Sequence, residues 1–197
     1  APVPGWLTPY DWQGWLDFDA LPRIVNPADG ALATANGNWM PPGYSHFITY
    51  DWDEPFRQSR VEELVIGAEE KHSARSMAAI QADTFSPALA AFRDQALAQL
   101  EQGAGQDAAM LAALGAWDGH MLADRPEPLI VTAWWRHFGE ALLKDDLGSD
   151  FARLAKGSIE PVLNILRGRQ SRDWCDDIAT QPVESCGHIL ARALGAT

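Results

Sequence analysis

Apolar residues recur every three to four positions over most of the chain after residue 55, which is the pattern of amphipathic helices. Residues that favour the first turn of a helix precede these stretches at Pro55, Ser73, Ser86, Asp107 and Pro126. The longest helix is expected after Pro126, and shorter ones are expected at 149–156, 159–168 and 181–194. This part of the chain is therefore predicted to be mainly α.

The first part of the chain has a different pattern, rich in Pro and Trp and with little periodicity. A short extended segment is predicted at 21–25, and a strand of small residues at 31–36, which ends at the turn dipeptide Asn36-Gly37. An aromatic loop follows as far as Asp51. We expect two units: a loop-and-strand segment at 1–51 and a helical domain at 52–197.

The charge of the chain restricts its partners. The 197 residues include 27 acidic and 15 basic ones, for a formal net charge of −12. A field of this sign repels phosphate backbones and anionic lipids, so neither nucleic acid nor a membrane surface is expected as a partner. The apolar runs are also shorter than the roughly 18–20 residues of a membrane span.

The two cysteines, Cys175 and Cys186, lie on either side of a turn that contains Pro182. Their proximity predicts a disulfide, which would favour a periplasmic or secreted protein. Two buried free thiols are the alternative. A zinc site is disfavoured because neither a CxxC pair nor paired histidines accompany the cysteines.

Several common sites are absent from the sequence: it has no GxSxG, no P-loop, no GxGxxG after a strand and no HExxH. The carboxylates of Asp173, Asp176 and Asp177 fit a solvated helix cap better than a cation site. His137 falls on the apolar face of the longest helix and is expected to be a hydrogen-bonded core histidine. No metal or other cofactor is predicted.

A set of short motifs in the first two thirds of the chain is more informative. The motifs are Asn26-Pro27, Gly30, the run Ala33 to Asn36, Asp51-Trp52, Pro55, Arg57, Arg60-Val61, then Met77, Gln81, Asp83, Ser86 and the run Ala116 to Gly119. Their order and spacing resemble the penicillin acylase family of N-terminal nucleophile hydrolases. The resemblance implies a mainly α fragment of that family's αββα architecture, from the large subunit.

The resemblance also implies roles for individual residues. Enzymes of the family use a Ser freed by autocatalytic cleavage, with its own α-amine as base. Asn36 matches the asparagine whose side-chain amide stabilises the oxyanion, although a simple left-handed turn asparagine is the alternative. Arg57 matches an arginine that orients this asparagine. Tyr50, Trp39 and Phe47 fall where aromatic residues of the acyl pocket are expected.

The chain departs from the family pattern at three positions. Gly37 replaces a second asparagine, and His46 replaces a carboxylate that helps some members to hold calcium. The resemblance thus allows calcium in the complete enzyme, but we do not expect it in this chain. Ala1 cannot serve as the nucleophile. The expected partners are therefore the small subunit and the Ser-led part of the large subunit, and the isolated chain is expected to be inactive.

The resemblance implies hydrolysis of the amide of a small N-acylated substrate. A β-lactam side chain, an N-acyl-homoserine lactone and an acylated peptide all remain open as that substrate. A non-catalytic helical module for binding or docking is the alternative function.

Overall fold

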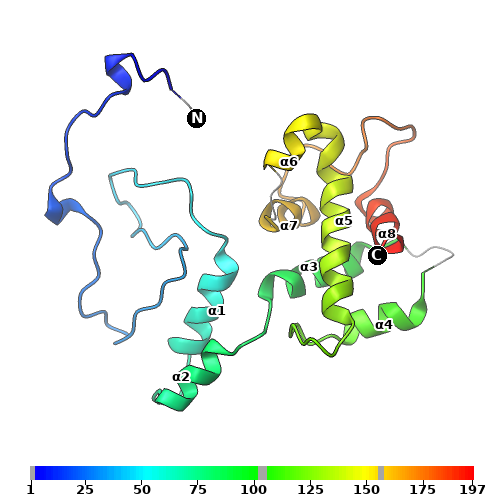
Figure 1. The fold of residues 1–197 in the computed structure, drawn as a ribbon, viewed down its shortest axis with the longest axis horizontal. Helices are drawn as coiled ribbons and strands as arrows, with labels where there is room; N and C mark the ends of the chain where they lie inside the picture. The colour runs from blue at the N-terminus through cyan, green and yellow to red at the C-terminus, as the bar shows by residue number, and fades with distance from the viewer. Residues whose placement is uncertain (1–2, 102–105, 155–157) are drawn as a thin grey trace.

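A computed structural model of the chain describes residues 3–101, 106–154 and 158–197. The chain is mainly α, as predicted (Figure 1). The α-helices are α1 (Pro55–Val65), α2 (Ala74–Gln81), α3 (Pro87–Gln99), α4 (Ala108–Ala116), α5 (Glu127–Leu147), α6 (Phe151–Leu154), α7 (Glu160–Leu166) and α8 (Cys186–Gly195). Short 3-10 turns occur at η1 (Thr8–Tyr10), η2 (Phe18–Ala20) and η3 (Gly148–Asp150).

Side-chain caps begin three of the helices where the sequence predicts them. The hydroxyl of Ser73 accepts a hydrogen bond from the backbone N–H of Ser76 at the start of α2. Ser86 caps α3, and the carboxylate of Asp107 accepts from the N–H of Ala109 in α4. These side chains satisfy N–H groups that have no partner within the helix, so local chemistry fixes the three boundaries.

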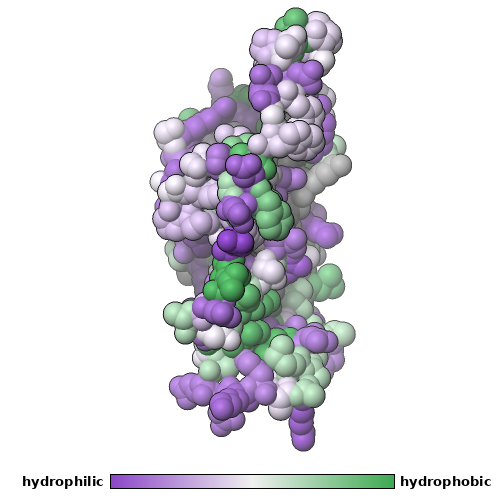
Figure 2. All heavy atoms as spheres, turned by 90° about the vertical axis from the view of Figure 1, so that its left-hand side faces the viewer, coloured by the Kyte–Doolittle hydropathy of each residue, from purple (hydrophilic) through white to green (hydrophobic). Residues whose placement is uncertain are grey.

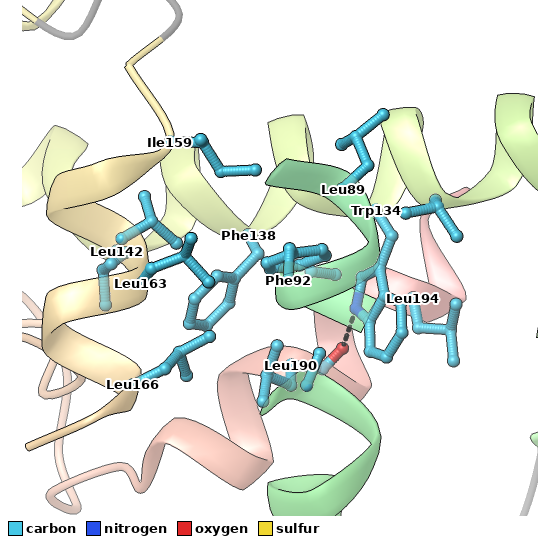
Figure 3. Packing of buried hydrophobic residues seen from close by; sticks show 14 of the residues in the cluster. Leu89, Phe92, Trp134, Phe138, Leu142, Ile159, Leu163, Leu166, Leu190 and Leu194 are labelled. Atoms are coloured by element: carbon cyan, nitrogen blue, oxygen red, sulfur yellow. Dashed lines mark hydrogen bonds between the residues drawn. The ribbon is translucent and has the colours of Figure 1, made fainter. Parts of the chain in front are cut away.

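The core lies where α3, α5, α7 and α8 meet. Phe92 of α3 packs edge-on against Trp134 of α5, with ring centroids 5.5 Å apart, and also contacts Phe138 (Figure 3). The indole N–H of Trp134 donates to the backbone carbonyl of Leu190 in α8 at 2.9 Å. The core therefore joins helices that are distant in sequence, through dense apolar packing and a buried hydrogen bond.

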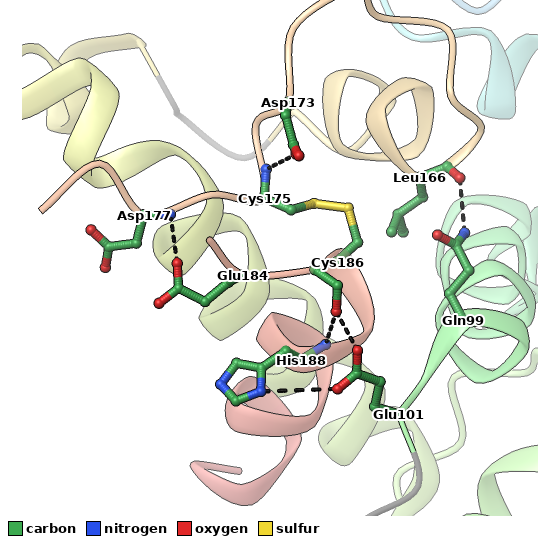
Figure 4. The surroundings of a disulfide bond; sticks show 10 residues. Gln99, Glu101, Leu166, Asp173, Cys175, Asp177, Glu184, Cys186 and His188 are labelled. Atoms are coloured by element: carbon green, nitrogen blue, oxygen red, sulfur yellow. Dashed lines mark hydrogen bonds and ion pairs between the residues drawn. A yellow bond between two sulfur atoms is a disulfide. The ribbon is translucent and has the colours of Figure 1, made fainter. Parts of the chain in front are cut away.

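The disulfide between Cys175 and Cys186 fastens the start of α8 to the loop that precedes it (Figure 4). The two Cα atoms are 4.9 Å apart. Beside it, Ser185 caps α8 by accepting from the N–H of His188, and Gln99 of α3 donates to the carbonyl of Leu166 at the end of α7. The C-terminal helix is thus held by a covalent link as well as by the core.

Some details differ from the sequence expectations. The helix expected at 181–194 begins only at Cys186, because Ser185 caps it there. The helix expected at 149–156 is η3 followed by α6, and its last two positions lie outside the described residues. The assignment of His137 to the core was wrong: its side chain is exposed, because only the positions aligned with Trp134 and Phe138 on α5 face the core.

The segment before α1 forms neither of the short strands expected within it. Among the described residues the only strand-like pairing is an isolated bridge between Phe85 and His120. A strand requires a neighbouring strand for its backbone hydrogen bonds, and residues 31–36 have none in the part of the chain that the structure describes. Their partner is instead a side chain of α1.

Residues 3–53 wrap beside α1 without forming a core of their own (Figure 1). Gly37 is the only buried residue among them. Large apolar side chains lie open on this segment, including Trp6, Trp12, Trp15, Phe18, Val25 and Phe47. Figure 2 shows hydrophobic atoms at the surface of the face that this segment helps to form.

Two carboxylate contacts connect this region to the helical core. The carboxylate of Glu54, at the N-terminal end of α1, accepts from the hydroxyl of Ser158 and from the N–H of Glu160, both at 2.7 Å. The start of α1 is therefore fixed to the start of α7. No helix in the described ranges combines the length and the apolar character that crossing a membrane requires.

Candidate active site

Asn36 occupies a tight turn whose backbone is held in place. Its φ angle is +62°, in the left-handed region that asparagine tolerates better than most residues. Its carbonyl accepts a hydrogen bond of 3.0 Å from the N–H of Asp53, just before α1. The turn is therefore tied to the start of the helix, and the Asn36 side chain lies exposed.

Arg57, in the first turn of α1, brings the groups of this turn together. Its Nη2 lies 2.7 Å from Asn36 Oδ1, 3.1 Å from the carbonyl oxygen of Ala35 and 2.9 Å from Asp53 Oδ2. Asp53 and Arg57 are four residues apart, so they also form an ion pair along the helix start. The two residues assigned to catalysis from the sequence therefore lie in direct contact.

This contact determines which side of the Asn36 carboxamide is available. Oδ1 is occupied by the guanidinium, and a planar carboxamide then directs its NH₂ group to the other side. Among the described residues, that NH₂ group donates to no acceptor. A guanidinium on the oxygen also polarises the amide, so its N–H becomes a stronger donor.

Gln58 contacts the same segment from the adjacent position on α1. Its Oε1 accepts from the N–H of Ala35 at 2.5 Å, and its Nε2 donates to the carbonyl of Ala33 at 3.1 Å. Nε2 also donates to Glu62 Oε1 at 2.6 Å. Gln58 was not singled out from the sequence, because nothing in its local pattern indicates a contact with residue 35.

α1 is anchored on its other side by Arg60. The guanidinium donates to both carboxylate oxygens of Asp83, at 2.8 and 3.1 Å, and lies over the ring of Phe85. The two side chains are only 19% and 16% exposed. Their hydrogen bonds lower the pKa of Asp83 below its ordinary value of 3.8 and raise that of Arg60. Both residues stay charged at neutral pH, so α1 keeps its position.

The aromatic residues expected in an acyl pocket are largely open to solvent. Phe47 and Tyr50 pack against each other with ring centroids 4.5 Å apart, and Tyr50 is 93% exposed. Trp39 is 40% exposed. None of the three lines the cavity of about 380 Å³ that Arg57 and Arg60 border between α1 and the start of α3. In the part of the chain that the structure describes, they therefore form no enclosed pocket around Asn36.

The donors near the turn do not fit a calcium site. His46, which stands where some family members have a carboxylate, lies edge-on to Tyr44 with ring centroids 5.7 Å apart. A histidine ring is a poor ligand for this hard cation. Across 3–101, 106–154 and 158–197, no three or more His, Cys, Asp or Glu side chains cluster as metal ligands would.

Taken together, the geometry provides one oriented donor and a rigid support for it. The Asn36 carboxamide is aimed by Arg57, the turn is tied to Asp53, and α1 is anchored through Arg60. An exposed and pre-oriented amide N–H is suited to stabilising negative charge that develops on a carbonyl oxygen. Of these groups, Asn36 and Arg57 were indicated by the sequence, whereas the contacts of Asp53, Gln58 and Glu54 were not.

Similarity to known proteins extends along the whole chain. The family model described as penicillin amidase matches residues 1–197. Penicillin acylase 2 proenzyme from Pseudomonas sp. (strain SE83) is 33% identical over 120 residues, which is 61% of this chain and 15% of that protein. The acyl-homoserine lactone acylases QuiP of Pseudomonas syringae pv. syringae and Pseudomonas aeruginosa are each 29% identical, over 217 and 215 residues.

The two QuiP proteins are matched over 99% of this chain but over only 26% and 25% of their own length. The chain thus spans about a quarter or less of these curated relatives. The family match extends from the first residue to the last, and it includes the turn that holds Asn36. The relatives named above are acylases by name. This chain belongs to the penicillin amidase family.

Proposed function

We propose that this chain is part of an acylase that hydrolyses the amide of a small N-acylated substrate, and that Asn36 is its oxyanion donor. The nucleophile is an N-terminal Ser outside these 197 residues. The substrate is a β-lactam with an acylated side chain or an N-acyl-homoserine lactone, the two substrate classes that the names of the relatives indicate. The chain by itself is inactive.

The proposed reaction proceeds through a tetrahedral intermediate. The Ser hydroxyl loses its proton to the α-amine of the same residue as its oxygen bonds to the carbonyl carbon. The carbonyl π electrons move to oxygen, and Asn36 Nδ2 donates a hydrogen bond to the resulting oxyanion. Collapse breaks the C–N bond, the amine leaves with a proton, and water then hydrolyses the ester in a second, similar step.

The observation that carries this proposal is the 2.7 Å contact between Arg57 and Asn36 Oδ1. An asparagine that merely completes a turn needs no cation on its side-chain oxygen. Here the guanidinium holds the oxygen and leaves the NH₂ group directed outwards, at an exposed position. This is the arrangement that a pre-oriented oxyanion donor requires.

Asn36→Ala in the full-length protein that carries this chain tests the proposal. The measurement is release of the primary amine from an N-acyl-homoserine lactone and from an acylated β-lactam. Loss of one oxyanion donor typically lowers kcat by about 10²–10³, and KM should change little because the donor acts mainly in the transition state.

Asn38→Ala is a matched control, because Asn38 lies two residues away and its Oδ1 only accepts from the N–H of Met40. It should retain wild-type kcat. An Asn36→Ala enzyme with kcat within about threefold of wild type would contradict the oxyanion role. Turnover of either substrate by the 197-residue chain alone at the full-length rate would contradict the placement of the nucleophile.

The same proposal includes the surroundings of the chain. Its partners are the small subunit and the Ser-led part of the large subunit, which cover the apolar side chains that residues 3–53 leave open. The division into 1–51 and 52–197 separates the part that faces the reaction from the part that supports it. We place the protein in the periplasm or outside the cell, where the disulfide between Cys175 and Cys186 persists. This chain holds no metal, and any calcium ion of the complete enzyme is bound by the rest of the protein.

The alternative, a non-catalytic binding module, is favoured by one feature of the helical part. A cavity of about 590 Å³ lies between α5 and α7, and its walls include Trp135, Phe151 and Trp174. Its size and its aromatic walls suit a small apolar ligand. A binding module would keep its affinity for such a ligand in Asn36→Ala, and neither substrate would be hydrolysed by the wild-type protein.

A further inference from the structure

Gln58 forms the kind of pairing with residues 33–35 that a neighbouring strand would form. A backbone strand offers one acceptor and one donor to the residues opposite, and the Gln58 carboxamide does the same through Oε1 and Nε2. The orientation of this amide is unambiguous, because the N–H of Ala35 must meet the oxygen. The NH₂ group then faces the carbonyl of Ala33 and the carboxylate of Glu62.

Gly37 packs against the same side chain from the other side of the turn. A Cβ added at Gly37 would lie 2.9 Å from Gln58 Cβ and 3.0 Å from Gln58 Cγ, closer than side-chain atoms normally approach. Gly37 is also the buried residue of its segment. The glycine, which the sequence presents as a departure from the family pattern, therefore makes room for the stem of Gln58.

Resting on the proposed function, we propose that Gln58 and Gly37 act as a pair that positions Asn36 for catalysis. Gln58 fixes the peptides before Asn36, and Gly37 allows α1 to come close enough for it to do so. With these peptides fixed, Arg57 can donate to both Asn36 Oδ1 and the carbonyl of Ala35. Gln58 is a positioning residue that acts through Asn36 and does not itself touch the substrate.

The physical reason is that an oxyanion donor is sensitive to small displacements. Residues 31–36 have no neighbouring strand among the described residues, so without Gln58 the peptides around Ala35 lose two of their hydrogen bonds. A shift of about 1 Å at a reacting group is enough to lower a rate by about 10². The effect should appear in kcat, because substrate binding does not depend on this donor.

The first experiment compares Gln58→Ala, Asn36→Ala and the double variant in the full-length protein. Gln58→Ala is expected to lower kcat by about 10- to 100-fold with KM within about threefold of wild type. In the Asn36→Ala background the same change should have no further effect, because the residue it positions is gone. Gln81→Ala, an exposed glutamine at the end of α2, is the matched control and should keep wild-type kcat.

The second experiment tests the pair. Gly37→Ala should lower kcat on its own, because the new methyl group collides with Gln58. Gln58→Gly removes both the Cβ and the stem that this methyl group meets, so the Gly37→Ala/Gln58→Gly double variant should lose less than the product of the losses of its two single variants. Strict multiplicativity would show that the two residues act independently and would overturn the proposal.

Hydrogen exchange of the peptide that contains Ala35 gives a readout that does not depend on activity. The Ala35 amide should exchange faster in Gln58→Ala than in the wild type, and at the wild-type rate in Gln81→Ala. Unchanged exchange, unchanged kcat in Gln58→Ala, or an equal loss in the Asn36→Ala background would each overturn the positioning role. If the wild-type protein hydrolyses no acyl substrate, the proposed function fails, and exchange alone then shows whether Gln58 holds this segment.

Discussion

Arg57 Nη2 lies 2.7 Å from Asn36 Oδ1, and this contact joins a turn of the N-terminal segment to the first turn of α1. The same nitrogen also reaches the carbonyl of Ala35 and the carboxylate of Asp53. Since an NH₂ group has two hydrogens, three acceptors require one of them to be shared. The guanidinium is therefore the centre of the candidate site, and its planar shape is part of its role.

Arg57→Lys should for this reason impair the enzyme although the charge is kept. A lysine ammonium is a compact cation on a flexible stem, and it cannot reproduce the fixed plane of the guanidinium. We expect kcat to fall by about 10-fold for Arg57→Lys and by about 10² for Arg57→Ala. Steady-state kinetics on either acyl substrate measure this. Equal activities of Arg57→Lys and wild type would show that only the positive charge matters.

The ion pair between Arg60 and Asp83 should make stability depend on pH in the acidic range. The folded-state pKa of Asp83 is lower than its ordinary value of 3.8, so the pair contributes fully above that value. The contribution is lost as the pH falls through the lowered pKa. Asp83→Asn should therefore reduce the free energy of unfolding by about 1–3 kcal/mol at neutral pH, because the largely buried guanidinium of Arg60 then keeps only the exposed carboxylate of Glu63 as a charged partner among the described residues.

The deficit of Asp83→Asn should begin to shrink as the pH falls below about 3.8, where the Asp83 carboxylate of the unfolded wild type takes up a proton, and it should vanish below the lowered pKa of the folded state. Chemical unfolding measured from about pH 7 to pH 3 checks this. Asp94→Asn is a suitable control, because its carboxylate is 64% exposed and pairs with Arg93 beside it in sequence. A deficit that stays constant over the whole range would show that Asp83 acts through packing and not through its charge.

The disulfide should stabilise α8 locally. In the chain-entropy model a loop of this length contributes about 2–3 kcal/mol, so replacing both Cys175 and Cys186 by Ser should lower the opening free energy of α8 by about that amount. Hydrogen exchange of the α8 amides measures it. Reductant should have the same effect on the wild type and none on the double variant. Exchange in α8 that is insensitive to both changes would assign its stability to the core alone.

Trp134 should stabilise the fold through its indole hydrogen bond as well as through its apolar packing. Trp134→Phe removes the buried hydrogen bond to the carbonyl of Leu190 and leaves a small void between α5 and α8. A cost of about 1–3 kcal/mol is expected from the lost hydrogen bond and the poorer packing. Trp135→Phe, at the neighbouring half-buried position, should cost less. Chemical unfolding of both variants measures these costs. Equal free energies of unfolding for Trp134→Phe and Trp135→Phe would contradict the prediction.

Much of the helical part was predictable because its signals are local. Ser73, Ser86 and Asp107 cap helices where the sequence places the helix starts, and Pro55 stands in the first turn of α1. The expectation for His137 failed for a physical reason as well. Its position lies at the margin of the apolar stripe of α5, and only packing against neighbouring helices decides how wide the buried stripe is.

The candidate site was predictable only in part. The resemblance of residues 26–60 to the family indicated Asn36 and Arg57, and the structure places the two in contact. Tyr50, Trp39 and Phe47 stay predictions as pocket residues, because nothing in the described chain encloses them. Gln58 could not be predicted from the sequence, because its partners are 23 and 25 residues away and a local periodic pattern does not indicate contacts over that separation.

The sequence by itself determined the main helices and the starting residues of those that a side chain caps, because capping and periodic burial act between near neighbours in the chain. The family and the candidate catalytic asparagine were indicated by the resemblance of short motifs to a known family. Only the tertiary structure decided which groups hold the asparagine, that a glutamine side chain takes the place of a strand beside it, and that a glycine makes this possible. Those contacts depend on how α1 lies against a segment with little regular structure, and that placement is fixed by long-range packing, ion pairs and close approach of backbones.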